Sequence, residues 1–252
     1  MVYFVGAGPG AEDLITVRGM RLLEQADVVI YAGSLVNPAL LKYVKTGCVL
    51  HDSAFMTLED VLAVIEEAED RKFVTVRLHS GDPSIYGAIQ EQMDALRERK
   101  IDFAICPGVS SMSGAAAALE LEYTLPGVSQ SIIVTRQQGQ TEMPEGEQLR
   151  SLAAHHATMV LFLSAGLAEQ VKIQLLAGGY EPDTPVAVVH KATWPEEKIL
   201  RTTLDKLPQE MEREQIVRTA LIIVGKVLDG GGRRSRLYDA SFTTGFREGK
   251  ER

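Results

Sequence analysis

Residues 1–13 read MVYFVGAGPGAED, and this stretch sets the fold. Val2–Val5 has the β-branched and aromatic composition of a short strand, and Gly6–Ala11 ends it with a Gly/Pro turn. A helical pattern follows from Leu14 to Ala26, and we expect Asp13 to cap that helix. A strand that leads through a tight turn into a helix is the first half of a βαβ unit, so the stretch predicts a parallel sheet.

The same order of strand, turn and helix recurs through about residue 120. Further strands are expected at Val28–Tyr31, Val74–Leu78 and Phe103–Cys106, and further helices at Leu58–Glu69, from Ile85 to about Glu98, and over the small-residue run GAAAALEL. In such sheets ligands collect outside the carboxyl ends of the strands. The Gly-containing turns GAGPG, HSGDP and PGVSS are therefore the candidate ligand-binding region.

The pattern changes after Leu125-Pro126-Gly127. The strand-like segments here are Ser131–Thr135, Met159–Leu163, Val186–His190, Ile199–Thr203 and Ala220–Val224, with one clear helix, Ala168–Leu176, that Gly178-Gly179 ends. The turn-like TWPEE between two of these strands indicates antiparallel pairing and a mixed sheet. We divide the chain into an N-terminal α/β domain (1–126), a C-terminal α/β domain (127–229) and a Gly-hinged basic tail (230–252).

Composition excludes several classes of protein. The 252 residues carry a net charge of −8, which argues against a generic nucleic-acid binder, and their 45% hydrophobic content is enough for a real core. Residues 226–252 reverse the charge balance, with seven basic and four acidic residues. This tail is a candidate contact for an anionic ligand or a neighbouring subunit.

The two cysteines, Cys48 and Cys106, form neither a CxxC motif nor a Cys/His cluster, so we expect no disulfide framework and no metal site. The apolar run at the N-terminus stops at Gly6, and later runs such as Ala220–Val224 are far too short to span a membrane. We expect a cytoplasmic protein without a membrane segment.

Gly6, Gly8 and Ala11 match the dinucleotide pattern G-x-G-x-x-A. That mechanism needs a helix that begins at once, to present N–H groups to the pyrophosphate, and an acid at the end of the second strand. Pro9-Gly10 occupies the place of the first helical turn, and Ala32-Gly33-Ser34 follows the second strand without an acid. The dinucleotide site fits poorly, and a tight turn without a ligand is the other local alternative.

The stretches GAGPGAEDLITVRG, DVVIYAGSLV, RLHSGDPSIYG and PGVSSMSGAAA, in that order, resemble the tetrapyrrole (cobalamin-pathway) S-adenosylmethionine-dependent methyltransferases. The similarity spans nearly the whole chain. IYAGSLV and the tail SRLYDASFTTGFR point to one member rather than to its C2, C17 or C20 relatives. The resemblance implies two α/β domains with a ligand cleft between them, S-adenosylmethionine as donor, S-adenosylhomocysteine as product, a tetrapyrrole substrate and a homodimer.

By resemblance, twelve residues bind the methyl donor: Pro9, Ser80, Gly81, Asp82, Ile85, Ser110, Ser111, Leu163, Lys191, Ala192, Thr219 and Ala220. The residues themselves allow other roles. Asp82-Pro83 has the form of a helix N-cap followed by a first helical position, Ser110 and Ser111 have the form of capping serines, and Leu163 resembles an ordinary core residue.

The implied reaction is displacement at a sulfonium methyl by a carbon of the macrocycle, in which alignment in a dry cleft outweighs acid–base work. His51, His79 and Tyr86 are the candidates for assisting a proton's departure, although a lone His is more often structural. The substrate's carboxylates require local cations. The candidates are Arg18, Arg136, Lys191, Arg201 and Arg218, with Arg233, Arg234 and Arg236 from the tail. We expect the polar loop Gln137–Gln148 to close over the macrocycle.

Several alternatives remain open. A same-fold methyltransferase could act on a different precorrin, uroporphyrinogen, diphthine or a ribosomal RNA ribose, of which RNA is disfavoured by the net charge. The other classes are a dinucleotide-dependent oxidoreductase and a non-catalytic, ligand-sensing dimer.

Overall fold

The computed structural model describes residues 1–233 and 235–250, which pack into two compact units. The first unit comprises Met1–Ala115 together with Lys191–Glu197, and the second comprises Ala116–His190 and the chain from Lys198 onward. Each unit carries one five-stranded sheet with helices, so the predicted fold class of two α/β units is confirmed. The domain boundaries at residues 126 and 229 stay our proposal.

The sheet of the first unit is entirely parallel. Its strands are β1 (Val2–Gly6), β2 (Val28–Tyr31), β3 (Val49–Asp52), β4 (Thr75–His79) and β5 (Phe103–Cys106), in the order β3-β2-β4-β1-β5. All five carboxyl ends therefore lie at one edge. The sequence did not predict β3, because this edge strand leaves Val49 and Leu50 exposed and lacks a buried, alternating pattern.

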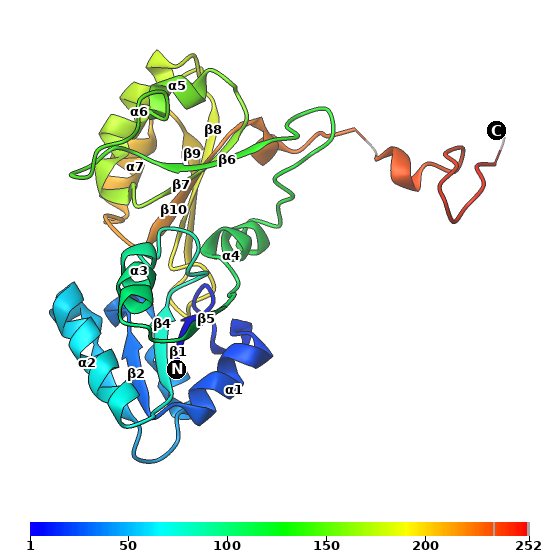
Figure 1. Ribbon diagram of the computed structural model, residues 1–252. Helices are drawn as coiled ribbons and strands as arrows, with labels where there is room; N and C mark the ends of the chain where they lie inside the picture. The colour runs from blue at the N-terminus through cyan, green and yellow to red at the C-terminus, as the bar shows by residue number, and fades with distance from the viewer. Residues whose placement is uncertain (234, 251–252) are drawn as a thin grey trace. The chain divides into compact units, whose positions relative to one another are not determined.

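Successive residues of β1 face opposite layers, as the pleat requires. Phe4 packs with α2 (Leu58–Asp70) and α3 (Gln90–Glu98), whereas Val5 packs with α1 (Val17–Gln25) and the 3-10 helix η3 (Pro38–Tyr43). Figure 1 shows α2 and α3 on one face of this sheet and α1 on the other. Thr57 and Asp60 form a capping box that fixes the start of α2.

The first helix begins later than the sequence predicted. A 3-10 turn, η1 (Glu12–Leu14), is followed by extended backbone at Ile15, and α1 begins at Val17. Thr16 caps it by accepting a hydrogen bond from the Gly19 N–H, so the prediction that Asp13 is the N-cap is wrong. The physical reason is that Ile15 is drawn into the core, which interrupts the helical path.

The third helix also begins later, at Gln90 instead of Ile85. Tyr86 and Ala88 have positive φ values, +55° and +49°, which no α-helix accommodates. The segment after β4 is therefore an irregular turn. The small-residue helix is α4 (Ser111–Ala118), three residues ahead of its predicted start.

The second unit has the predicted mixed sheet. Its strands are β6 (Ile132–Arg136), β7 (Thr158–Phe162), β8 (Pro185–His190), β9 (Lys198–Thr203) and β10 (Ala220–Val224), in the order β6-β7-β10-β8-β9. Only β6 and β7 run parallel; the other neighbours are antiparallel. Besides the predicted α6 (Ala168–Ala177), the unit contains α5 (Leu149–Ala153) and α7 (Leu207–Arg213), which are too short to show a clear helical period.

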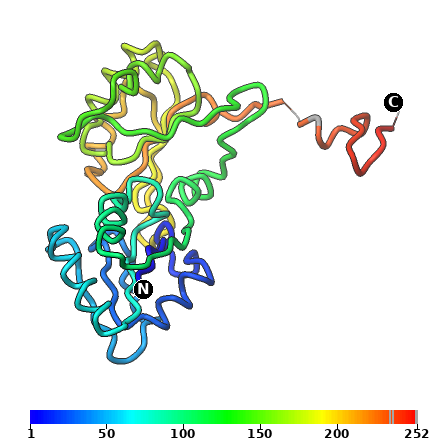
Figure 2. Tube along the Cα trace, viewed as in Figure 1, coloured from blue at the N-terminus to red at the C-terminus, as the bar shows by residue number. Residues whose placement is uncertain are grey.

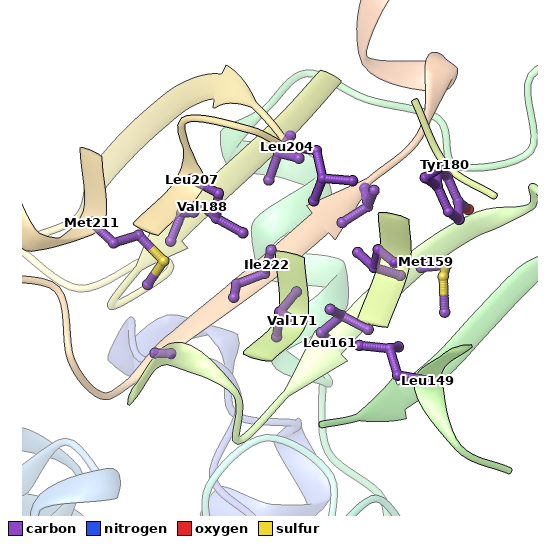
Figure 3. Close-up of a cluster of buried hydrophobic side chains, with 14 of the residues drawn as sticks. Leu149, Met159, Leu161, Val171, Tyr180, Val188, Leu204, Leu207, Met211 and Ile222 are labelled. Carbon is purple, nitrogen blue, oxygen red and sulfur yellow. The ribbon is translucent and has the colours of Figure 1, made fainter. Parts of the chain in front are cut away.

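One apolar cluster holds the second unit together, and Figure 3 labels ten of its members. Met159, Leu161, Val188 and Ile222 come from the central strands, and Val171 comes from α6. Buried leucines and methionines of this kind contribute about 2–5 kcal/mol each when measured by truncation to alanine.

Short 3-10 helices follow several strands: η2 (Gly33–Leu35), η4 (Ser53–Phe55), η5 (Ala165–Leu167) and η6 (Lys226–Asp229), with η7 (Arg236–Tyr238) in the tail. The predicted hinge at residues 230–232 is anchored at its end, because the Arg233 N–H donates to the Pro126 carbonyl at 2.7 Å. Figure 2 allows the path of the chain to be followed by colour. Across the described residues, none of the helices combines the length and apolarity that a membrane span requires.

Candidate functional site

Three turns meet at the carboxyl edge of the first sheet. They follow β1, β4 and β5 and comprise Gly6–Gly10, Ser80–Pro83 and Pro107–Ser111. Because β1 lies between β4 and β5, the three turns are neighbours, as the sequence predicted from their Gly, Pro and Ser content. We call this group the glycine cradle.

The turns after β1 and β4 are joined by their backbones. The Gly8 N–H donates to the Gly81 carbonyl at 3.2 Å, and the Gly81 N–H donates to the Gly8 carbonyl at 2.8 Å. Both residues have positive φ values, +82° and +60°, which glycine adopts without steric cost. This pair fixes the two turns against each other.

The turns after β1 and β5 approach even more closely. A Cβ atom on Gly108 would lie 2.1 Å from the Gly81 carbonyl oxygen and 2.7 Å from Gly6 Cα, and a Cβ atom on Gly6 would lie 2.5 Å from Gly108 Cα. Only glycine fits at either position. The missing side chains let the three turns pack backbone against backbone, so the residues that follow these glycines lie close together at one sheet edge.

The Asp82 carboxylate connects the turns after β4 and β5. Its Oδ2 accepts from the Gly108 N–H at 2.8 Å, and its Oδ1 accepts from the Ser84 N–H at 2.9 Å and from the Ser84 hydroxyl. Partial burial by itself would raise the pKa of Asp82, but the hydrogen bonds from Ser84 and Gly108 outweigh it and hold the pKa below its usual value. Asp82 is therefore ionised at neutral pH.

The alternative role of Asp82 as a helix N-cap is wrong, because no helix begins at Pro83. The bond from the Ser84 N–H closes a local Asp turn instead. For Ser110 the capping role holds, since its Oγ accepts from the Met112 N–H at 3.4 Å at the start of α4. The structure places all seven donor-binding candidates of the first half on the cradle or in the segment after it: Pro9, Ser80, Gly81, Asp82, Ile85, Ser110 and Ser111.

Lys191 and Ala192 belong to the first unit although they follow β8. Lys191 Nζ lies 3.6 Å from a Glu196 carboxylate oxygen and 5.6 Å from the centre of the Trp194 ring. The next two residues, which sequence reasoning did not select, contact the turn after β1. Thr193 Oγ1 accepts from the Ala11 N–H at 2.9 Å, and Trp194 Nε1 donates to the Pro9 carbonyl at 3.1 Å.

The remaining donor candidates lie at one edge of the second sheet. Ala220 pairs with His190, and Leu161 pairs with Ile222, so this register places Leu163 and Thr219 at the same edge. Leu163 is 67% exposed, which contradicts a role as a core residue. Both residues have positive φ values, +52° and +53°, a conformation that L-residues retain mostly at functional or tightly constrained positions.

The three catalytic candidates have different surroundings. His79, at the end of β4, is buried, and burial together with the Arg77 charge lowers its pKa to about 3, so its imidazole is neutral at physiological pH. A group with such a pKa is a poor proton acceptor. His51 is partly buried on β3, and Tyr86 is 45% exposed in the irregular turn after β4.

The arginine candidates are divided between the two units. Arg18 lies on α1 in the first unit, and Arg136, Arg201 and Arg218 lie in the second. Arg136 Nη2 donates to the carbonyls of Thr141 and Glu142, at 3.2 and 3.1 Å, so it holds the loop that we predicted to close over the substrate.

Arg201 lies midway along β9 and donates to the Leu119 carbonyl at 3.1 Å. Arg18 and Arg218 are exposed. From the tail, Arg233 lies against Gly127, Arg234 lies outside the described residues, and so does the side chain of Arg236.

The geometry also bears on the dinucleotide alternative. The helix α1 begins at Val17, seven residues after Gly10, so its N-terminal N–H groups are not part of the turn. The second strand ends at Tyr31 and leads into Ala32 and η2 without an acid. Neither element that binds a pyrophosphate and a ribose in a Rossmann site is in place.

Comparison with known proteins gives consistent matches. The family model for tetrapyrrole (corrin/porphyrin) methylases matches residues 1–208. A cobalt-precorrin-4 C(11)-methyltransferase of Methanocaldococcus jannaschii is 50% identical over 248 residues, which are 98% of this chain and 96% of that protein. A precorrin-4 C(11)-methyltransferase of Pseudomonas aeruginosa is 46% identical over 251 residues, 99% of each chain.

Solved structures agree. The crystal structure of a cobalt precorrin-4 methyltransferase superposes with a TM-score of 0.88 at 46% identity, covering 90% of this chain and 95% of that one. The uroporphyrin-III C-methyltransferase of Thermus thermophilus, complexed with S-adenosylhomocysteine, superposes with a TM-score of 0.74 at 28% identity and covers 90% and 92% of the two chains.

Proposed function

The chain belongs to the tetrapyrrole (corrin/porphyrin) methylases, and from this premise we propose that it transfers a methyl group from S-adenosylmethionine to C11 of precorrin-4 or cobalt-precorrin-4. This is the reaction named for relatives that share 46–50% of its residues over nearly its whole length. It would place the chain in corrin-ring synthesis. The observation that carries the proposal is the glycine cradle, whose turns are the family-like motifs of the sequence.

The cradle fits the methyl donor. When bound, S-adenosylmethionine supplies a methyl group on a positively charged sulfur. The ionised Asp82 offers a negative charge to the donor's cationic groups, and Ser80, Ser110 and Ser111 offer hydroxyls. The glycines let the turns pack backbone against backbone, which brings the segments that carry Ser80, Asp82 and Ser110 together.

For the macrocycle, we propose the apolar rim of the same sheet edge. Leu35 follows β2, Phe55 follows β3 and Tyr86 follows β4, and all three side chains are exposed, Phe55 to 89%. The segment after each of these three neighbouring strands thus carries an exposed aromatic or aliphatic side chain, which suits the flat, apolar face of a tetrapyrrole. Arg18, exposed at the start of α1, is a candidate cation at this edge.

The residues of the first unit support catalysis by alignment. His79 is neutral and buried beside Phe4, so it neither supplies nor accepts a proton at neutral pH. His51 and Tyr86 remain the candidates for receiving a proton from the macrocycle. With both reactants bound at one edge, orientation and exclusion of water supply most of the rate enhancement.

The proposal is tested with S-adenosylmethionine that carries a ¹³C-labelled methyl group. The purified protein is incubated separately with precorrin-4, cobalt-precorrin-4, earlier precorrins, uroporphyrinogen III and diphthine-containing protein. We expect one labelled methyl on a precorrin-4 substrate, located at C11 by NMR. Methylation of a different acceptor with precorrin-4 left unchanged would contradict the substrate, and labelling of no acceptor would contradict the activity.

We also propose that the protein is a cytoplasmic homodimer in which the basic tail contacts the partner subunit. In the described tail, Arg247 Nη2 donates to the carbonyls of Leu237, Asp239 and Phe242, and this fold leaves Tyr238 and Phe246 exposed. Exposed aromatic side chains beside basic residues favour a protein contact. Truncation after Gly230 should lower the sedimentation mass; an unchanged mass would contradict the role of the tail.

A further inference from the structure

The loop Lys191–Glu197, which follows β8 and precedes β9, lies against the turn after β1 and belongs to the first unit. Figures 1 and 2 show its yellow tip beside the blue turn near the N-terminus. We call it the clasp loop. We propose that Thr193 and Trp194 of the clasp loop are positioning residues that hold the glycine cradle in the shape the methyl donor needs; this inference rests on the proposed function.

The clasp loop binds the backbone on both sides of Gly10. Trp194 Nε1 donates to the Pro9 carbonyl at 3.1 Å, and the Ala11 N–H donates to Thr193 Oγ1 at 2.9 Å. From another segment, Asn37 Nδ2 donates to the Gly10 carbonyl at 2.8 Å. Two consecutive peptide groups of the turn are thus held by side chains that are remote in the sequence.

Trp194 also explains why the turn contains a third glycine. A Cβ atom on Gly10 would lie 2.1 Å from Trp194 Cδ1 and 2.4 Å from Nε1. These atoms belong to a rigid ring, so the side chain could not move aside by a small rotation. Gly10 is therefore required by the indole, whereas Gly6, Gly8 and Gly108 are required by neighbouring backbone.

The clasp loop is itself tightly held. The Thr193 N–H donates to a Glu197 carboxylate oxygen at 2.6 Å, and the Trp194 N–H donates to the Lys191 carbonyl at 3.0 Å. Thr193 has a φ of +68°, a conformation that β-branched residues rarely adopt. A costly backbone conformation that is stabilised by its surroundings points to a required position of the side chain, here that of Thr193 Oγ1.

The clasp loop also restrains the glycine cradle through Gly8. Gly8, two residues before Gly10, is bonded to Gly81, so a shift of Pro9–Ala11 would move the turn that meets the Asp82 segment. A cradle that is already ordered binds its ligand without the entropic cost of ordering a loop. Thr193 and Trp194 thus act on the donor through the turn, which distinguishes them from residues that touch it.

The test uses variants that each remove one hydrogen bond: Thr193→Val and Trp194→Phe, with Thr193→Ser as the rescue and Lys198→Gln, on exposed β9 surface, as the control. Calorimetric titration with S-adenosylhomocysteine should show about three- to tenfold weaker binding for T193V and W194F, the effect of one lost hydrogen bond. T193S and K198Q should bind like the wild type. In amide hydrogen exchange without ligand, T193V should lose protection at the Ala11 N–H.

These readouts separate the inference from the proposed function. Failure of the wild type to bind S-adenosylhomocysteine would contradict the proposed function, whereas the exchange of Ala11 tests the clasp without ligand. Unchanged Ala11 protection in T193V would overturn the inference. The inference would also be overturned if T193V lost this protection but kept an affinity for S-adenosylhomocysteine within twofold of that of the wild type. Should T193V fail to fold, W194F, which retains a large ring, carries the binding test.

Enlarging residue 10 tests its contact with Trp194 independently of the hydrogen bonds. Gly10→Ala should shift the fluorescence of Trp194, the only tryptophan in the chain, because its indole must move. On a Trp194→Ala background the same G10A change should have little further effect on affinity, since the clash is gone. Equal losses of affinity from G10A on both backgrounds would contradict the assignment of Gly10 to Trp194.

Discussion

The two sheets of this protein end in different kinds of edge. The parallel sheet of the first unit ends in turns that are bonded backbone to backbone, with glycines at each close approach. The mixed sheet of the second unit ends in ordinary side chains, such as Leu163 and Thr219, on left-handed backbone. A site built from glycine turns leaves a clear signal in the sequence, whereas a site built from one leucine or threonine does not.

The largest expected effect concerns the first edge. Gly108→Ala places a Cβ atom 2.1 Å from the Gly81 carbonyl oxygen, and neither backbone can yield without separating two strands. We expect a loss of about 3 kcal/mol in the free energy of unfolding and at least a hundredfold loss of S-adenosylhomocysteine affinity. Urea denaturation and calorimetry measure both.

Gly139→Ala, in the second unit, is the matched control, because its Cβ atom would meet only Leu167 Cδ1 at 3.6 Å. It should leave stability and affinity nearly unchanged. If G108A behaved like G139A, the comparison between the two edges would lose its basis.

The next effect tests the charge within the cradle. Asp82→Asn keeps one acceptor oxygen, so it cannot satisfy both the Gly108 N–H and the Ser84 N–H, and it removes the negative charge. We expect S-adenosylhomocysteine to bind roughly 10- to 100-fold more weakly, by calorimetry, with a smaller effect on the melting temperature. Wild-type affinity in D82N would show that the carboxylate is not part of the donor site.

A third prediction concerns pH and the buried end of β4. The pKa of His79 is about 3 in the folded protein against an ordinary value of 6.5, so the unfolded chain binds more protons between these values. Above pH 6.5 the lowered pKa of His79 has almost no effect on the free energy of unfolding. As the pH falls from 6.5 towards 3, protonation of the unfolded chain destabilises the fold increasingly. Between pH 7 and pH 5 the loss is about 2 kcal/mol in the free energy of unfolding.

Urea denaturation of the wild type and of His79→Gln at both pH values measures this difference. The variant should lose about 2 kcal/mol less than the wild type over that interval, because it lacks the titrating group. The same pH dependence in both proteins would show that His79 is accessible to protons in the folded state.

The smallest effect tests the second edge. Leu163 is exposed, so Leu163→Ala should change the free energy of unfolding by less than about 0.5 kcal/mol and weaken S-adenosylhomocysteine binding by roughly two- to fivefold. Its buried neighbour on β7 provides the contrast, since Leu161→Ala should cost about 3 kcal/mol. If L163A left the affinity unchanged, Leu163 would not contact the donor.

The same contrast explains what the sequence could predict. Four strands of the first sheet and the cradle turns followed from β-rich runs ended by Gly, Pro and Ser, whereas β3, an edge strand with exposed Val49 and Leu50, did not. The start of α3 could not be predicted, because Tyr86 and Ala88 take left-handed conformations that neither residue type favours. Asp13 looked like a cap only because the burial of Ile15 is not visible in the local pattern.

Thr193 and Trp194 were missed for a related reason. Their partners, Ala11 and Pro9, lie more than 180 residues away in the sequence, and only the tertiary fold brings them together. The signal that could have selected them is the single tryptophan of the chain, placed in a short turn between two strands. In the structure its ring occupies the space where a side chain at residue 10 would lie, and that residue is glycine.

The measurement that tests the central claim most directly is calorimetric titration of the wild-type protein with S-adenosylhomocysteine and, separately, with NAD. The glycine cradle as a methyl-donor site predicts saturable binding of S-adenosylhomocysteine and no binding of NAD. Saturable binding of NAD without binding of S-adenosylhomocysteine would contradict the account, because the turn after β1 would then serve a dinucleotide.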